Sequence, residues 1–458
     1  MTSFQAVSPV DGRVFVDRPF TNLAQVSGRL DASRLAFSEW RALSLAERTV
    51  AVRRLIDAIE SRTDVLADEL TLQMGRPRRF AAGEIEGFCF RGHTLCDLAE
   101  EALADVVPPA KDGFERFIRY EPLGVVLILA PWNYPWLTAV NALVPALLAG
   151  NTVLLKHSEQ TPLVADRLVE AAKEAGLPAG VFQTVDMSND TTAAVVRDPR
   201  VAFVSFTGSV EGGRAVHSAA GGLFKGVALE LGGKDPAYVR ADADLDHAVP
   251  NLVEGAMFNS GQSCCSVERI YVDERLYDAF VERFVDEAQR WVAGDPSAPG
   301  TWLGPMVRAR NADAVRAQVD AAIAAGATAH LPVDSASGSA YLGPQVLTEV
   351  TDDMAIMAEE TFGPAVGIVK VSGDDQAIER MNASRYGLTA SIWTRSTDAA
   401  RDLGGRLETG TVFANRCDYL DPELAWVGVK DSGRGVSLSR LGFHAFTRPK
   451  SFHLREHA

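Results

Sequence analysis

Four continuous apolar runs between residues 124 and 206 constrain the fold more than any other feature of this sequence. They span residues 124–130, 152–155, 181–185 and 201–206. Apolar side chains at every position, rather than at every second one, are typical of strands buried on both faces of a parallel sheet. Helical segments such as 162–175 separate the runs, so the region predicts βαβ units in a doubly wound sheet.

Secondary structure predicted on either side of this region completes an α/β architecture. The first hundred residues are predicted to be helical, with Ser44 and Glu47 forming a capping box before an apolar helix face. After Gly233 the sequence predicts a second α/β domain, with strands at 269–272 and 365–371 and helices at 276–292 and 311–325. The tail 451–455 alternates like a half-buried strand without a local partner, which predicts pairing with another subunit.

Charge and cysteine content restrict the partners of the chain. Its 60 acidic and 45 basic residues give a formal net charge of -15, which disfavours nucleic acid and anionic membranes. The N-terminus lacks a signal-peptide pattern, and the apolar stretch 137–148 is shorter than the ~18 residues of a membrane span. Five cysteines without a CxxC pair, and histidines without HExxH, indicate a reducing compartment and no metal site. We therefore expect a cytoplasmic protein.

Cys264 is the first candidate for chemistry, because it follows a glycine-containing turn in the segment Phe-Asn-Ser-Gly-Gln-Ser-Cys-Cys, 258–265. A lone cysteine is more often a small buried hydrophobe. Two other segments change that interpretation. Asn133 follows the first buried strand, at the sheet edge where ligands bind, and its amide can donate to an oxyanion. Glu230 lies among apolar residues, which raises the pKa of a carboxyl toward that of a general base.

A strand, a small-residue turn and a helix start meet at Phe206-Thr207-Gly208-Ser209-Val210-Glu211-Gly212-Gly213. Backbone amides at such a helix start suit a pyrophosphate. The four segments together, in this order, resemble the aldehyde dehydrogenase superfamily over nearly the whole chain. Further similar motifs are Leu-Lys-His-Ser-Glu-Gln-Thr-Pro at 155–162, Glu-Glu-Thr-Phe-Gly-Pro at 359–364 and Lys-Asp-Ser-Gly at 430–433.

The resemblance implies that the chain is an NAD-dependent enzyme that oxidises an aldehyde to a carboxylic acid. Cys264 would be the nucleophile that forms a thiohemiacetal and then a thioester. Asn133 and the backbone N–H of Cys264 would form the oxyanion hole, and Glu230 would activate the hydrolytic water. The implied cofactor-binding set is Trp132, Lys156, Ser158, Glu159, Gly208, Ser209, Gly213, Leu231, Glu360 and Phe362.

Within that set the resemblance places Lys156 and Glu159 at the adenosine ribose, Ser209 at the pyrophosphate, Glu360 at the nicotinamide ribose and Phe362 beside the nicotinamide. A carboxylate at Glu159 would accept from both ribose hydroxyls and repel the extra phosphate of NADP, so NAD is the expected cofactor.

The resemblance also implies a fold. We expect a Rossmann-like cofactor domain (1–110 and 123–233, with a C-terminal return at 417–440), an α/β catalytic domain (234–416) and a β-strand oligomerisation arm (111–122 and 441–458). Such an arm implies a homodimer or homotetramer.

Two positions depart from the family pattern. Ala142 stands where most members carry a lysine, and Leu-Ser-Arg-Leu at 438–441 replaces a run that contains a glutamate. Both are linked with proton transfer from the general base. We therefore expect either a water-mediated route or slow deacylation.

The substrate stays open between two classes. The expected pocket residues are Tyr134, Thr138, Asn141, Phe258, Arg416 and Trp426. Their aromatic members favour an apolar or aromatic aldehyde, although they could equally be interdomain packing. Arg416 or Arg440 could instead hold the carboxylate of a semialdehyde. A CoA-acylating dehydrogenase and an inactive binding protein on the same fold are further alternatives.

Overall fold

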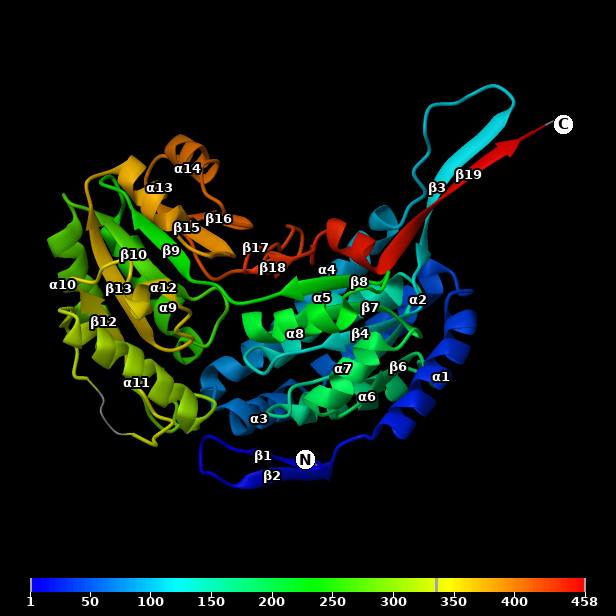
Figure 1. Cartoon of the computed structure of the whole chain (residues 1–458), viewed down its shortest axis with the longest axis horizontal. Helices are drawn as coiled ribbons and strands as arrows, with labels where there is room; N and C mark the ends of the chain where they lie inside the picture. Colours follow the sequence, from blue (N-terminus) through cyan, green and yellow to red (C-terminus); the bar gives the residue numbers. More distant parts are fainter. Residues whose placement is uncertain (1, 334–336, 457–458) are drawn as a thin grey trace.

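The computed structural model describes residues 2–333 and 337–456, and it contains two sheets side by side with a two-stranded arm projecting from one of them (Figure 1). The first sheet has the order β18-β8-β7-β4-β5-β6. Its parallel strands are β4 (Val125–Leu129), β5 (Thr152–Lys156), β6 (Phe182–Thr184), β7 (Val201–Thr207) and β8 (Gly226–Glu230), with β18 (Gly433–Arg434) antiparallel at the edge. The four strands predicted from apolar runs are confirmed.

Helices pack around this sheet and bury its apolar side chains. They are α1 (Leu23–Trp40), α2 (Leu45–Glu60), α3 (Thr63–Met74), α4 (Arg78–Ala102), α5 (Pro135–Leu148), α6 (Pro162–Glu174), α7 (Asn189–Arg197) and α8 (Val210–Ala220). The predicted capping box is confirmed, since Ser44 Oγ accepts from the Glu47 N–H at 3.2 Å and Glu47 Oε2 accepts from the Ser44 N–H at 2.7 Å.

The prediction that the first hundred residues are wholly helical is wrong at their start. β1 (Ser3–Val7) and β2 (Val14–Pro19) pair antiparallel before α1. Phe4 and Ala6 are buried while their neighbours are exposed, which is the period of two that a half-buried strand requires.

The second sheet has the order β11-β12-β13-β10-β9-β15-β16. Its strands are β9 (Asp235–Val239), β10 (Val267–Asp273), β11 (Thr328–Ala329), β12 (Gln345–Thr348), β13 (Ala365–Val371), β15 (Thr389–Trp393) and β16 (Thr411–Ala414). Its helices are α9 (Leu245–Met257), α10 (Tyr277–Ala288), α11 (Ala309–Ala324), α12 (Ala355–Ala358), α13 (Asp374–Asn382) and α14 (Thr397–Gly404). The predicted helix 276–292 is too long at its C-terminal end, because the chain turns after Ala288 and Ala293 bridges to Leu303.

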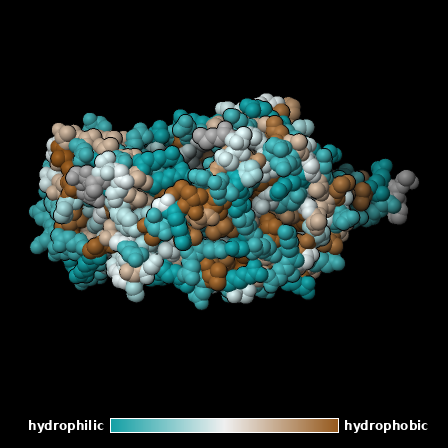
Figure 2. All heavy atoms as spheres, turned by 90° about the horizontal axis from the view of Figure 1, so that it is seen from below, coloured by the Kyte–Doolittle hydropathy of each residue, from teal (hydrophilic) through white to brown (hydrophobic). Residues whose placement is uncertain are grey.

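The arm consists of β3 (Phe114–Pro122) and β19 (Thr447–Arg455), antiparallel from Thr447 opposite Pro122 to Arg455 opposite Phe114. The tail therefore has a partner in its own chain, and the prediction that it has none nearby is wrong. The rings of Phe117 and Phe452 stack with centroids 4.4 Å apart. Figure 2 shows the arm extending beyond the body, with hydrophobic and hydrophilic residues on the visible face. Positions 457–458 of the expected arm lie outside the described residues.

Two short strands, β14 (Tyr386–Gly387) and β17 (Val429–Lys430), pair between the two large sheets. Among the helices of residues 2–333 and 337–456, none has the length and apolarity needed to cross a bilayer.

Candidate active site

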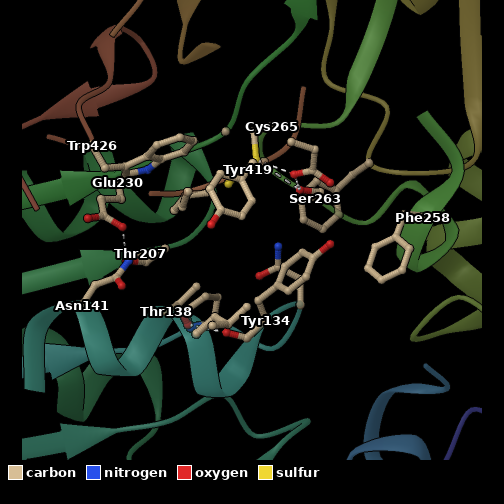
Figure 3. A pocket seen from close by; sticks show the side chains of 18 of the residues that line it. Tyr134, Thr138, Asn141, Thr207, Glu230, Phe258, Ser263, Cys265, Tyr419 and Trp426 are labelled. Atoms are coloured by element: carbon tan, nitrogen blue, oxygen red, sulfur yellow. Dashed lines mark hydrogen bonds between the residues drawn. The ribbon is translucent and has the colours of Figure 1, made fainter. Parts of the chain in front are cut away.

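A cavity of about 740 Å³ lies where the two sheets face each other, and it brings the expected catalytic residues together. Cys264, Glu230 and Asn133 all line it, although they come from three separate segments. Figure 3 shows Thr138 and Asn141 of α5, with Tyr134 just before the helix, on one side of the cavity, across from Cys265 and Tyr419. The cavity is large enough for a small substrate and the reactive end of a cofactor.

Cys264 is half-buried and follows a tight turn, the 3₁₀ segment η1 (Phe258–Gly261) at the end of α9. Asn259 and Ser260 both have φ of 55°, and Gly261 has φ of 67°. A side chain at Gly261 would collide with the Gly363 carbonyl. The turn is therefore held in a left-handed conformation that places Cys264 at the cavity wall.

Asn133 is fixed from both sides between β4 and α5. Its carbonyl accepts from Arg76 Nη2 at 2.8 Å and from Asn259 Nδ2 at 3.1 Å, and its own Nδ2 donates to the Gln262 carbonyl at 3.2 Å. Asn133 is thus tied to the turn that carries Cys264. Because an amide nitrogen carries two hydrogens, one N–H is left for an oxygen in the cavity.

A buried ion pair supports this loop. Arg76 pairs with Glu84, and Glu84 Oε1 accepts from the Trp136 N–H at 2.9 Å in the first turn of α5. Both side chains are almost completely buried, so removal of one partner would leave an uncompensated charge. The pair explains why α4 and α5 keep their positions beside the cavity.

Glu230 ends β8, and its Oε2 accepts from Thr207 Oγ1 at 3.2 Å. Burial raises the pKa of this carboxyl above its usual value, as a general base requires. Behind it lies a small cavity of about 10 Å³, lined by Asn141, Ala142 and Ser437, which gives room for about one water molecule. The small cavity beside Ala142, the position where most family members carry a lysine, is therefore partly polar.

The loop after β8 runs between the thiol and a second carboxylate. A side chain at Gly233 would collide with the Cys264 carbonyl, and the Gly233 N–H donates to Glu360 Oε1 at 3.0 Å. Burial raises the pKa of Glu360 to about 8. Glycine at position 233 therefore allows Glu360 and Cys264 to approach from opposite sides.

Most of the expected cofactor residues line the large cavity. These are Trp132, Gly208, Ser209, Leu231, Glu360 and Phe362. Ser209 caps α8, accepting from the Gly212 N–H at 3.1 Å, and the rings of Trp132 and Phe362 meet edge-on with centroids 5.5 Å apart. The Glu360 carboxylate has one hydrogen-bond donor, which leaves acceptor sites for ribose hydroxyls. These residues fit a dinucleotide.

Four expected cofactor residues do not line that cavity. Gly213 packs beneath the side chain of Leu231. Lys156 ends β5, and Ser158 and Glu159 follow it, at the same edge of the sheet as Asn133 after β4. Burial lowers the pKa of Lys156, whereas Glu159 nearby opposes that shift. Their position fits a ligand that extends out of the cavity along this edge.

All six expected substrate residues line the cavity: Tyr134, Thr138, Asn141, Phe258, Arg416 and Trp426. The guanidinium carbon of Arg416 lies 3.4 Å from the ring centroid of Tyr419. Arg440, by contrast, is exposed and pairs with Glu101. The suggestion that Arg440 holds a substrate carboxylate is therefore wrong.

Sequence reasoning missed several residues because their partners are distant in the chain. Arg91 lines the cavity from α4, and Cys265 Sγ donates to Asp418 Oδ1 at 2.8 Å. The hydrogen bond with Cys264, followed by burial, raises the pKa of Cys265, which keeps it a neutral thiol. Within the described residues, Asp57, Glu60 and His93 also place ligand-type atoms within 4.8 Å of one another, on the surface and apart from the cavity.

Comparison with known proteins gives the class of this molecule. The aldehyde dehydrogenase family model matches residues 1–452. A protein of Mycolicibacterium paratuberculosis named succinate-semialdehyde dehydrogenase [NADP(+)] is 36% identical over 97% of this chain and 95% of its own. An Escherichia coli protein named succinate semialdehyde dehydrogenase [NAD(P)+] Sad is 35% identical over 96% of each chain.

Solved structures agree with this result. The succinic semialdehyde dehydrogenase of Streptococcus pyogenes, in complex with NADP+, superposes with a TM-score of 0.95 at 30% identity over 99% of this chain and 100% of that one. An NAD-dependent aldehyde dehydrogenase from Sinorhizobium meliloti gives a TM-score of 0.95 at 35% identity over 99% and 92%.

The chain therefore belongs to the aldehyde dehydrogenase family. It is an oxidoreductase that acts on aldehydes and uses a nicotinamide cofactor, NAD or NADP.

Proposed function

We propose that this enzyme oxidises a semialdehyde, an aldehyde that carries a carboxylate, to a dicarboxylic acid through a thioester on Cys264. The convergence of Cys264, Asn133 and Glu230 on one cavity is the observation that carries the proposal. The names of the relatives favour a semialdehyde over the apolar or aromatic aldehyde expected from Tyr134, Phe258 and Trp426.

In the first half-reaction the Cys264 thiolate adds to the aldehyde carbon, and the carbonyl oxygen becomes an alkoxide. The free N–H of Asn133 and the backbone N–H of Cys264 stabilise that charge. Trp132, Ser209, Glu360 and Phe362 line the part of the cavity that would hold NAD, which would supply the hydride acceptor. Loss of the hydride from the carbon bonded to Cys264 would leave the substrate as a thioester.

In the second half-reaction Glu230 takes a proton from a water molecule, whose oxygen attacks the thioester carbon. The C–S bond breaks, and the acid and the Cys264 thiolate are released. We infer that the proton then leaves through the small polar cavity beside Ala142 and Ser437, where one water can stand between Glu230 and the protein interior.

The test is the variant Glu230→Gln, which removes the base and keeps the shape of the side chain. Because the thioester still forms, we expect a burst of about one NADH per active site. The steady-state rate that follows should be at least roughly 100-fold below that of the parent, which is the lower end of the rate contribution of one general acid–base residue. Cys264→Ala, the control, should show no burst. An undiminished steady rate would refute the role of Glu230, and a product that appears only with CoA would indicate an acylating enzyme.

We further propose that NAD is preferred over NADP. Glu159 follows β5 at the edge where the adenosine ribose is expected, and a carboxylate there repels a 2′-phosphate. The kcat/KM values for the two cofactors measure this directly, and Glu159→Ser should raise the value for NADP several-fold and lower that for NAD. A higher kcat/KM with NADP in the parent enzyme would contradict the proposal, and the names of several relatives make that comparison necessary.

We also propose that the first sheet with its helices is the cofactor domain, that 234–416 is the catalytic domain, and that β3 and β19 form an oligomerisation arm. The division is supported by the strands, since β4–β8 fall within 123–233, β18 within 417–440, and the seven strands of the second sheet within 234–416.

A further inference from the structure

Arg91 is the one buried arginine of the described residues whose hydrogen bonds come from a single nitrogen. Its Nη1 donates to the Leu137 carbonyl and to Asn141 Oδ1, both at 2.8 Å. No acceptor among residues 2–333 and 337–456 bonds its Nε or Nη2, and no carboxylate pairs with it. The side chain is only 7% exposed, and it lines the large cavity.

The other buried arginines are satisfied differently. Arg76 donates from all three nitrogens and pairs with Glu84. Arg269 likewise donates from all three, mostly to backbone carbonyls, and Arg316 pairs with Asp313. Arg269 also has no carboxylate partner, but each of its three nitrogens has an acceptor. Arg91 differs because its Nε and Nη2 have none among the described residues, and N–H donors without acceptors are costly in a buried side chain.

The nearest carboxylates do not supply the missing partner. Glu84 is occupied by Arg76 and by the start of α5, and Glu230 accepts from Thr207. Burial lowers the pKa of Arg91 to about 10, and Glu230 and Glu84 oppose that shift only from a distance. Arg91 lines the large cavity, so a ligand there is the remaining source of an acceptor for its Nε and Nη2.

We propose that Arg91 is the specificity-determining residue of this enzyme, and that its Nε and Nη2 bind the carboxylate of the semialdehyde substrate. Nε and Nη2 form the planar fork that matches the two oxygens of a carboxylate. Asn141 holds the fork in place from α5. The inference rests on the proposed function, because it assigns the recognition of the same substrate.

Arg416 is the competing candidate from the sequence. It also lines the cavity, but it is exposed and its guanidinium is stacked on Tyr419. An exposed cation loses little when its partner is absent, whereas a buried cation gains most from one. Because Arg91 is buried and pairs with no carboxylate, an anion in the cavity would stabilise Arg91 more than it would stabilise Arg416.

The experiment compares two substrates that differ in one charge, 4-oxobutanoate and its methyl ester, in the parent enzyme and in Arg91→Gln. We expect kcat/KM for the acid to fall roughly 10- to 100-fold, the range for loss of charge-assisted hydrogen bonds. The value for the ester should change less than about threefold. Arg91→Lys should recover only part of the preference, because it keeps the charge and loses the fork.

Arg79→Gln, an exposed arginine on the same helix, is the matched control and should keep the preference for the acid. A second readout needs no turnover: succinate should raise the Tm of the parent and of Arg79→Gln but not that of Arg91→Gln.

The outcomes separate the two proposals. Equal losses for acid and ester in Arg91→Gln, or an unchanged preference, would overturn the assignment of Arg91. If Arg416→Gln alone abolished the preference, the substrate class would stand and the residue would be wrong. If the parent enzyme did not prefer the acid, the proposed substrate class itself would fail, and the succinate measurement would still decide whether Arg91 binds a carboxylate.

Discussion

At the scale of single residues, the cavity contains carboxyl groups with displaced pKa values. Glu230 and Glu360 are both buried, and burial raises the pKa of each. A neutral carboxyl avoids the cost of a buried charge, and when it ionises both of its oxygens become acceptors. Glu360, whose pKa burial raises to about 8, is therefore poised to change its charge around that pH.

Glu360 gives a prediction about cofactor affinity. With its pKa at about 8, the carboxyl is mostly protonated below that pH and ionised above it. Because the ionised form accepts hydrogen bonds from ribose hydroxyls and attracts the positive nicotinamide, the Kd for NAD should fall as pH rises from 7 to 9. Fluorescence titration of the resting enzyme measures this without turnover.

In Glu360→Gln the pH dependence of the Kd for NAD between pH 7 and 9 should disappear, and a parent Kd that does not change with pH would contradict the assignment.

The raised pKa of Glu360 also affects the stability of the fold. Because the pKa of the folded state lies above the usual 4.5, this group stabilises the fold at low pH, and that contribution is lost as pH rises through about 8.

At the scale of elements, the arm projects from the body of the molecule (Figure 1). β3 and β19 pair with each other over their whole length, and Leu454 is 45% exposed. A two-stranded ribbon is marginally stable alone, and its outer edges offer unpaired N–H and C=O groups. Pairing with another subunit would satisfy both requirements.

The arm therefore gives a prediction about the molecular mass of the oligomer in solution. Leu454→Asp places a charge on the arm, and we expect light scattering to show a shift from dimer or tetramer toward a smaller species at micromolar concentration. Phe224→Asp changes an apolar residue that is more exposed than Leu454 and lies outside the arm, and it is the control. An unchanged mass in Leu454→Asp would argue against an interface at this position.

At the scale of the whole molecule, the active site belongs to neither sheet alone. Asn133 follows β4 and Glu230 ends β8 in the first sheet, whereas Cys264 lies between α9 and β10 of the second. The turn at 258–261 and the loop after β8 bring these parts into contact through Asn259, Gln262 and Gly233. The relative position of the two sheets therefore sets the distance between the thiol and its base.

The sequence alone determined the buried strands, the order of the βαβ units and the identity of Cys264, Asn133 and Glu230 as candidates, because these depend on local apolar runs and short motifs. Only the tertiary structure decided that Arg91 lines the cavity together with Arg416, since Arg91 meets Asn141 across 50 positions of the chain. It also decided that β19 pairs with β3 and that Arg440 lies on the surface. Burial and long-range pairing depend on how distant segments pack, and no local pattern encodes them.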